Sequence, residues 1–228
     1  MSLKQHYDEL YQTSVKQYKS DAYQIDNLID STTDKRYGVT LLIRPPKKVK
    51  SEIKKLLDEL QSQEPEQYFY PESDIHITVM SIISCYDGFD ISQINVASYA
   101  AVIHKCLEEL FSFDIIFKGL TLSPSCLMVQ GFFSDKTLSE IRENLRIHFK
   151  SSNLQHSIDK RYTIQTAHAT IFRLRENLRN PHKFLETVAK YKNHEFGVFT
   201  VSSLELVTND WYQRQERVQK LNEFNLKC

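Results

Sequence analysis

The chain has 228 residues and a mass of 26.8 kDa, and its 29 basic and 29 acidic side chains give a formal net charge of +0. Hydrophobic residues make up 41% and charged residues 25%, a balance typical of globular proteins. The neutral charge argues against a protein that binds a long nucleic acid, because affinity for nucleic acid comes mainly from clustered Lys and Arg. Five glycines and six prolines exclude a collagenous or low-complexity chain.

Two features bear on where the protein works. The first residues, MSLKQHYDELYQ, lack the apolar run of a signal peptide, and no stretch has the length of a membrane span. The cysteines show no CxxC spacing and fit reduced thiols better than a disulfide framework. We therefore expect a cytoplasmic protein with no membrane partner.

The N-terminal part of the chain predicts a polar helix. Within residues 3 to about 30, apolar side chains such as Tyr7 and Val15 recur at helical spacing. We interpret residues 1–35 as an N-terminal helical extension that packs on the main fold, and a partner-binding helix is the alternative. The main domain then covers residues 36–228.

The first half of the main domain predicts two strands, each followed by a helix. The run Tyr37 to Ile43 is rich in β-formers and is closed by Pro45 and Pro46, which indicates a buried strand. The elements expected after it are a helix over 47–61, a loop rich in aromatic residues, a strand from Ile75 to Ile83 and a helix over 95–110.

The second half has a similar make-up. Residues 113–122 and 126–133 predict a hairpin around a Ser-Pro-Ser turn. The elements expected after it are a helix capped by Ser134, a strand from Thr166 to Arg175, a helix started by Asn180 and Pro181, one or two strands from Phe196 to Val207, and a closing segment of helical character from Trp211 to Phe224. Mixed strands and helices without a wide linker predict one α+β or α/β domain.

Several common chemistries are absent from the sequence. The five glycines are too dispersed for a P-loop or a dinucleotide-binding turn. There is no GxSxG nucleophile elbow and no HExxH zinc helix, and the eight histidines form no close metal-ligand pair. We therefore expect no cofactor and no metal.

A His-x-Thr pattern occurs in two apolar β-runs. It comprises His76 and Thr78 in the first half of the chain, and His168 and Thr170 in the second. Successive side chains of a strand alternate between its faces, so each motif offers an imidazole and a hydroxyl on one face, about 7 Å apart.

This pair of motifs suits in-line displacement at phosphorus, which needs proton transfer both at the attacking oxygen and at the leaving oxygen. Imidazoles fill either role near neutrality, and hydroxyls stabilise charge on the phosphate oxygens.

With these motifs, HITV at 76–79 and HATI at 168–171, the chain resembles the 2H phosphoesterase superfamily, which includes 2′-5′ RNA ligase-like proteins and cyclic nucleotide phosphodiesterases. The strand that ends in Arg44-Pro45-Pro46 and the long helix after it add to the resemblance, which covers about residues 36–210. It implies an α+β bilobal fold, with two pseudo-symmetric β-sheet lobes and flanking helices around a central groove.

The resemblance also implies the chemistry. His76 and His168 would be the acid and base, and Thr78 and Thr170 would bind the phosphate. The reaction would be hydrolysis of a 2′,3′-cyclic phosphate or a 2′-5′ phosphodiester, with RNA ligation as the reverse reaction.

Further candidates lie near the motifs. Arg173 matches a basic residue often found after the second motif. Alternation places it on the face opposite His168 unless the strand bends or ends there, so a phosphate contact and a structural ion pair both stay open. Aromatic side chains at the rim of a groove stack nucleobases, worth about 1–3 kcal/mol each. The candidates for stacking or for lining the pocket are Tyr68, Tyr70, Tyr162 and Phe172.

Two other interpretations stay open. One is a non-catalytic nucleotide-binding, RNA-binding or interaction module on the same fold, and the other is two core histidines without a shared role. As partner we expect a small nucleotide or a short oligonucleotide rather than long duplex nucleic acid, and we expect a monomer.

Overall fold

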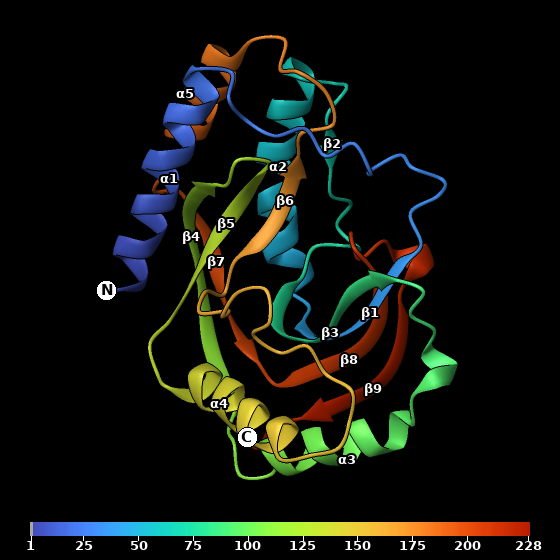
Figure 1. The fold of residues 1–228 in the computed structure, drawn as a ribbon. Helices are drawn as coiled ribbons and strands as arrows, with labels where there is room; N and C mark the ends of the chain where they lie inside the picture. The colour runs from blue at the N-terminus through green and yellow to red at the C-terminus, as the bar shows by residue number, and fades with distance from the viewer. Residues whose placement is uncertain (1) are drawn as a thin grey trace.

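The computed structural model describes residues 2–228, which form five α-helices and two antiparallel sheets (Figure 1). The first sheet has the strand order β3 (Ile77–Asp87), β1 (Arg36–Ile43), β8 (Ser203–Asp210) and β9 (Gln219–Asn225). The second sheet has the strand order β2 (Tyr68–Phe69), β6 (Ala169–Arg173), β5 (Cys126–Phe133), β4 (Phe113–Leu122) and β7 (Glu195–Val201). The predicted α+β class is confirmed.

The helices flank the two sheets. They are α1 (Leu3–Lys19), α2 (Lys47–Gln63), α3 (Val96–Leu107), α4 (Thr137–Lys150) and α5 (Pro181–Lys190). Helix α1 packs on β4 and α5, and α2 packs on β7 and α5 (Figure 1). At the other end of the molecule α3 and α4 pack on each other, and α4 also contacts β3. The described helices include none that is long and apolar enough to cross a membrane.

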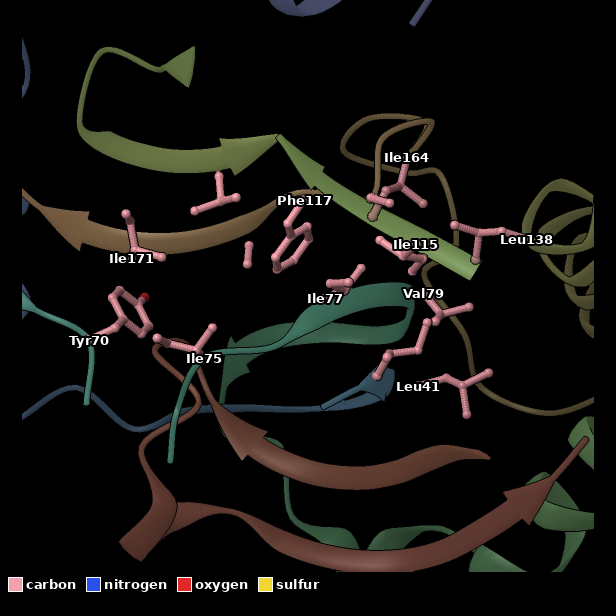
Figure 2. Packing of buried hydrophobic residues seen from close by; sticks show 14 of the residues in the cluster. Leu41, Tyr70, Ile75, Ile77, Val79, Ile115, Phe117, Leu138, Ile164 and Ile171 are labelled. Atoms are coloured by element: carbon pink, nitrogen blue, oxygen red, sulfur yellow. The ribbon is translucent and has the colours of Figure 1, made fainter. Parts of the chain in front are cut away.

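The hydrophobic core lies where the two sheets face each other. Figure 2 shows Leu41, Ile77 and Val79 of the first sheet opposite Ile115 and Phe117 of the second. All five side chains are fully buried. Because successive residues of a strand point to opposite faces, this packing of β3 leaves the residues between its core positions free to face elsewhere.

Two local predictions are confirmed. The hairpin strands have the predicted bounds, 113–122 and 126–133. Helix α5 starts as predicted, because the Asn180 side chain accepts a hydrogen bond from the main-chain nitrogen of Lys183 at 3.0 Å, and Pro181 is its first residue.

Three predicted helix bounds are wrong. The N-terminal helix ends at Lys19 instead of near residue 30, and the third helix ends at Leu107. Helix α4 begins at Thr137 rather than after a cap at Ser134, since the side chain of Asp135 accepts the hydrogen bond from the Thr137 nitrogen. Each error lies at a helix end, where apolar spacing carries little information.

The closing segment is also different from its prediction. Residues 211–224 were expected to be helical, but they form a short 3-10 turn and the edge strand β9, which pairs with β8. Pairing with a neighbouring strand decides the structure of this largely polar segment, and its own sequence pattern does not reveal that partner.

The N-terminal segment is held on the second sheet by buried polar contacts. The Tyr7 hydroxyl donates to the carbonyl of Gly131 at 3.2 Å, and the Ser14 hydroxyl donates to the carbonyl of Leu122 at 3.0 Å. The division of the chain at residue 35 stays a prediction.

Candidate active site

Both His-x-Thr motifs line one cavity of about 410 Å³, whose walls come from strands of both sheets. The first motif contributes His76 and Thr78, and the second contributes His168 and Thr170. Each of the four side chains is partly exposed. A volume of this size is typical of small-molecule sites. Two motifs that lie far apart in the sequence therefore face the same space.

The imidazole of His76 is held through one ring nitrogen. The sequence predicts this residue inside a strand, but β3 begins one residue later, at Ile77. Its Nδ1 lies 2.7 Å from the main-chain oxygen of Asp74. Because a carbonyl oxygen only accepts, Nδ1 carries a hydrogen, and Nε2 of the neutral ring keeps a free lone pair. A free lone pair is what a general base needs.

The imidazole of His168 is held through the same ring atom. This residue also directly precedes its strand, since β6 begins at Ala169. Its Nδ1 lies 2.6 Å from the hydroxyl oxygen of Thr166, which can donate or accept. The carbonyl of Thr166 in turn accepts a hydrogen bond from Arg142 at 2.7 Å. Arg142 thus holds the main chain of Thr166, and the Thr166 hydroxyl orients the second imidazole.

A β-bulge lies directly after the threonine of each motif. The register of β3 against β1 skips Val79, which directly follows Thr78. The register of β6 against β5 skips Ile171, which directly follows Thr170. Both skipped side chains are fully buried, and Figure 2 labels both within the core cluster. A bulge re-aims the side chains around it, so the two halves of the site share this local geometry.

The bulge at Ile171 decides which later side chains of β6 face the cavity. It puts Arg173 on the same side of the strand as Thr170, and Arg173 lines the cavity, whereas strict alternation places it on the opposite face. Phe172, a candidate for stacking or for lining the pocket, is fully buried and is not among the residues that line the cavity. It packs instead against the rings of Phe69 and Phe184, with centroids 5.3 and 5.2 Å away.

Arg173 is fixed by two partners. Its Nε donates to the Tyr70 hydroxyl at 2.9 Å, and its Nη1 lies 3.4 Å from a carboxylate oxygen of Asp26. The other oxygen of Asp26 accepts a hydrogen bond from the Tyr212 hydroxyl at 2.9 Å. Burial lowers the pKa of Arg173, but the neighbouring Tyr70 and Asp26 more than offset this and raise it above its ordinary value. Arg173 therefore keeps a fixed positive charge at the wall of the cavity.

Comparison with known proteins gives structural matches only, since no family model and no curated protein matches the sequence. TT0787 of Thermus thermophilus is 14% identical with a TM-score of 0.59, over 84% of this chain and 98% of that chain. A protein described as a phosphoesterase is 11% identical with a TM-score of 0.58, over 85% and 99%. E. coli LigT in complex with 3′-AMP is 10% identical with a TM-score of 0.56, over 85% and 99%. The chain has the LigT fold.

At these identities the match establishes the LigT fold and no more. It confirms, for the architecture, the resemblance to the 2H phosphoesterase superfamily. The LigT of E. coli has been crystallised with 3′-AMP, ATP, phosphate and NADP+. In the present LigT-like chain, the two motifs lie at the start of β3, an edge strand of the first sheet, and at the start of β6 in the second.

Both imidazoles of the cavity have a lowered pKa. Burial lowers the pKa of His76 to about 4. The hydrogen bond to the Asp74 carbonyl opposes this effect, and the positive charges of Arg44 and of His168 add to it. Burial likewise lowers the pKa of His168 to about 4, with added repulsion from Arg142. Both rings are thus uncharged at neutral pH in the free protein. Within residues 2–228, no group of three or more His, Cys, Asp or Glu side chains is placed to hold a metal ion.

The predicted aromatic residues separate into two groups. Tyr70 and Tyr162 line the cavity, and Tyr162 is 64% exposed, as expected of a side chain at a rim. Tyr68 does not line the cavity but packs edge-on against Tyr70, with ring centroids 5.2 Å apart. Tyr68 therefore supports the cavity wall from behind.

One aromatic side chain of the cavity was not predicted from the sequence, that of the single tryptophan, Trp211. The ring of Trp211 lies between two guanidinium groups, 4.7 Å from that of Arg36 and 4.5 Å from that of Arg161. It was assigned to a closing helical segment, and the polar residues directly before it, Thr208 to Asp210, gave no sign that it lines a cavity.

Two charged residues behind the cavity were missed as well. Asp26 lies in a loop of the N-terminal segment, and nothing in its local sequence indicates a partner. Arg142 had a signal, because it falls on the apolar stripe of α4 that contains Leu138 and Leu145. A basic residue at a core position of a helix indicates a buried charge with a specific role.

Proposed function

We propose that this chain is a phosphoesterase that uses His76 and His168 as a general acid–base pair, without a metal ion. Its substrate would carry a 2′,3′-cyclic phosphate or a 2′-5′ phosphodiester on a nucleotide or a short oligonucleotide. The observation that carries the proposal is one cavity lined by two imidazoles, each oriented through Nδ1, and by two threonine hydroxyls.

The chemistry follows from the positions of these groups. For a cyclic phosphate, one neutral imidazole takes a proton from water as the water oxygen forms a bond to phosphorus. The bond from phosphorus to the 2′ or 3′ oxygen breaks on the opposite side, and the other imidazole, protonated, gives its proton to that oxygen. The hydroxyls of Thr78 and Thr170 donate to non-bridging oxygens, and the fixed charge of Arg173 offsets their negative charge.

The low pKa values of the imidazoles fit this mechanism when the substrate supplies its own charge. An isolated neutral pair lacks the proton that the general acid must give. A bound phosphate brings a negative charge next to both rings and favours their protonated forms. The mechanism needs one protonated ring and one neutral ring. Repulsion between like charges also disfavours protonation of both rings at once.

The size of the cavity supports a small substrate. A volume of about 410 Å³ suits a mononucleotide or the end of an oligonucleotide. The exposed Tyr162 at the rim offers a surface on which a nucleobase can stack. The balanced charge of the chain gives no support to a long duplex as substrate.

The direct test is phosphodiesterase activity in EDTA on a panel of nucleoside 2′,3′-cyclic phosphates and 2′-5′ dinucleotides. We expect turnover by the wild-type protein and a loss of about 10²- to 10⁴-fold in His76→Ala and in His168→Ala. His104→Ala is the matched control, because this histidine is exposed on α3 and far from the motifs in sequence. It should retain full activity.

Each contrary outcome removes a defined part of the proposal. Turnover that EDTA abolishes would contradict the metal-free mechanism. Full activity in either motif variant would remove that histidine from the chemistry. Binding of a nucleoside 2′-monophosphate without turnover of any panel member would favour the non-catalytic binding module.

A further inference from the structure

Arg142 is a buried cation held by main-chain oxygens. Its side chain lies on α4 and the residue is 2% exposed. Its Nε donates to the carbonyl of Val79 at 3.0 Å, and its Nη2 donates to the carbonyls of Thr78 at 3.2 Å and Thr166 at 2.7 Å. Among the contacts of residues 2–228, it forms no ion pair with a carboxylate.

Two of these carbonyls belong to the first motif, and the third lies two residues before the second motif. Thr78 and Val79 are the third and fourth residues of the first motif, and Thr166 holds the imidazole of His168 in the second. The two sheets that carry the motifs share no strand ladder in the described chain. One guanidinium group therefore makes a hydrogen-bonded link between the motifs that the sheets do not provide.

The bulge after the first motif makes this link possible. Consecutive carbonyls of a regular strand point in opposite directions, so one side chain does not ordinarily reach both. The register skip at Val79 breaks that rule and turns the carbonyls of Thr78 and Val79 toward one guanidinium. The rigid fork of Arg suits such a multiple contact, whereas the ammonium of Lys is a single point.

Stability alone gives little reason for this residue. A buried charge without a carboxylate partner is costly, and an apolar side chain would continue the stripe of α4. Burial lowers the pKa of Arg142 to about 10, so it is still charged at neutral pH. A charge kept at such a place indicates a task beyond packing.

We propose that Arg142 is a positioning residue, which sets the separation and orientation of the His76–Thr78 and His168–Thr170 pairs across the bound phosphate. This inference rests on the proposed function of the same cavity. It does not give Arg142 any contact with substrate, because Arg142 does not line the cavity of the motifs, and its Nε and Nη2 donate to main-chain oxygens. Two half-sites on separate sheets need such a link, since a misplacement of about 1 Å can lower a rate by about 10²-fold.

The charge of Arg142 also acts on His168. After burial, it is the next cause of the lowered pKa of that imidazole, followed by His6 and Arg173. Removal of the charge should raise the pKa of His168, while removal of the fork alone should not. The titration of His168 therefore reports the charge of Arg142 near the site, whereas kcat in a folded Arg142→Lys variant reports the link made by the fork.

The test compares Arg142→Met, which removes charge and fork, with Arg142→Lys, which keeps the charge, and with Lys150→Met, a control at an exposed site on the same helix. With a nucleoside 2′,3′-cyclic phosphate, we expect kcat to fall about 10²-fold in Arg142→Met and about tenfold in Arg142→Lys, with KM changed less than threefold. Lys150→Met should match the wild type. Thermal melting confirms that each variant is folded, and Arg142→Lys decides the test if Arg142→Met is not.

A histidine NMR titration gives a readout that needs no turnover. We expect the His168 pKa to rise in Arg142→Met and to stay within a few tenths of the wild-type value in Arg142→Lys. A loss of kcat that only follows the loss of folded protein, with an unchanged His168 titration, would overturn the proposal, as would unchanged kcat in a folded Arg142→Met. If the wild type hydrolyses no panel member, the proposed function fails, and the link is judged by whether Arg142→Met alone weakens the binding of inorganic phosphate.

Discussion

Anion binding should be coupled to proton uptake by the two imidazoles. In the free protein, burial holds the pKa of both His76 and His168 near 4. Sulfate is a useful perturbation, because it is a tetrahedral anion whose charge does not change in this pH range. Bound in the cavity, its charge stabilises imidazolium, so the pKa of at least one ring should rise toward or beyond the ordinary 6.5.

The size of the effect follows from these values. A return from about 4 to 6.5 corresponds to about 3 kcal/mol of coupling for one imidazole. At about pH 5.5, the fraction of protonated ring rises from a few per cent to about nine-tenths, so close to one proton should be taken up for each sulfate bound. As the pH rises from 5 to 7, the affinity for sulfate should then fall by up to about tenfold for each pH unit.

Isothermal titration calorimetry in two buffers of different ionisation enthalpy measures the uptake. We expect about one proton for the wild type and none for the double variant His76→Gln, His168→Gln. A wild-type uptake of zero, with a sulfate affinity that does not depend on pH, would refute the reasoning that the two rings face the bound anion.

Three further outcomes follow from the structure. Gly131→Ala should destabilise the fold by about 1–3 kcal/mol and lower kcat/KM more than about tenfold. The added Cβ would collide with the carbonyl of Ala167, which directly precedes His168. Thermal melting measures the loss of stability, and steady-state kinetics measures the loss of activity. Tyr7→Phe should lower the free energy of unfolding by about 1–2 kcal/mol, because it removes the hydrogen bonds to Gly131. Tyr18→Phe, on the same helix, removes a buried hydroxyl that has no partner among the described residues, and should leave the free energy of unfolding unchanged. Equal losses in the two variants would contradict this account. The free energy of unfolding, from urea titrations, should fall as the pH drops from 6.5 toward 4, because the unfolded chain binds protons at the histidines before the folded one does; the double variant His76→Gln, His168→Gln should show a shallower fall.

Much of the fold could be predicted from local patterns. The hairpin of β4 and β5 has two apolar runs around a turn, and α5 has a cap and a proline at its first position, so both were predicted with their correct starts. Strand β9 could not be found in this way, because most of its residues are exposed and its structure comes from pairing with β8.

The candidate site was predictable as far as alternation holds. The pairs His76–Thr78 and His168–Thr170 were found because both lie before the bulges, where the period of two is intact. Beyond the bulge, alternation misplaced Arg173. A bulge adds one residue without a sequence mark of its own, so the face of every later residue in the strand is reversed.

The residues of the site that lie far from both motifs in the sequence were the hardest to predict. Asp26 and Trp211 reach the site from loops, which have no period to follow. Arg142 is the exception, since a basic side chain interrupts an otherwise apolar helical stripe. That interruption was visible in the sequence, but its partners are main-chain carbonyls, which a sequence does not display.

The central claim is that His76 and His168 act together on one phosphate. A double-mutant cycle on kcat for a nucleoside 2′,3′-cyclic phosphate, with His76→Gln, His168→Gln and the double variant, tests this most directly. Because an acid and a base that act on the same transition state form a unit, the double variant should be no more than a few-fold slower than the slower single variant. Losses that multiply, or a single variant with wild-type kcat, would contradict the claim.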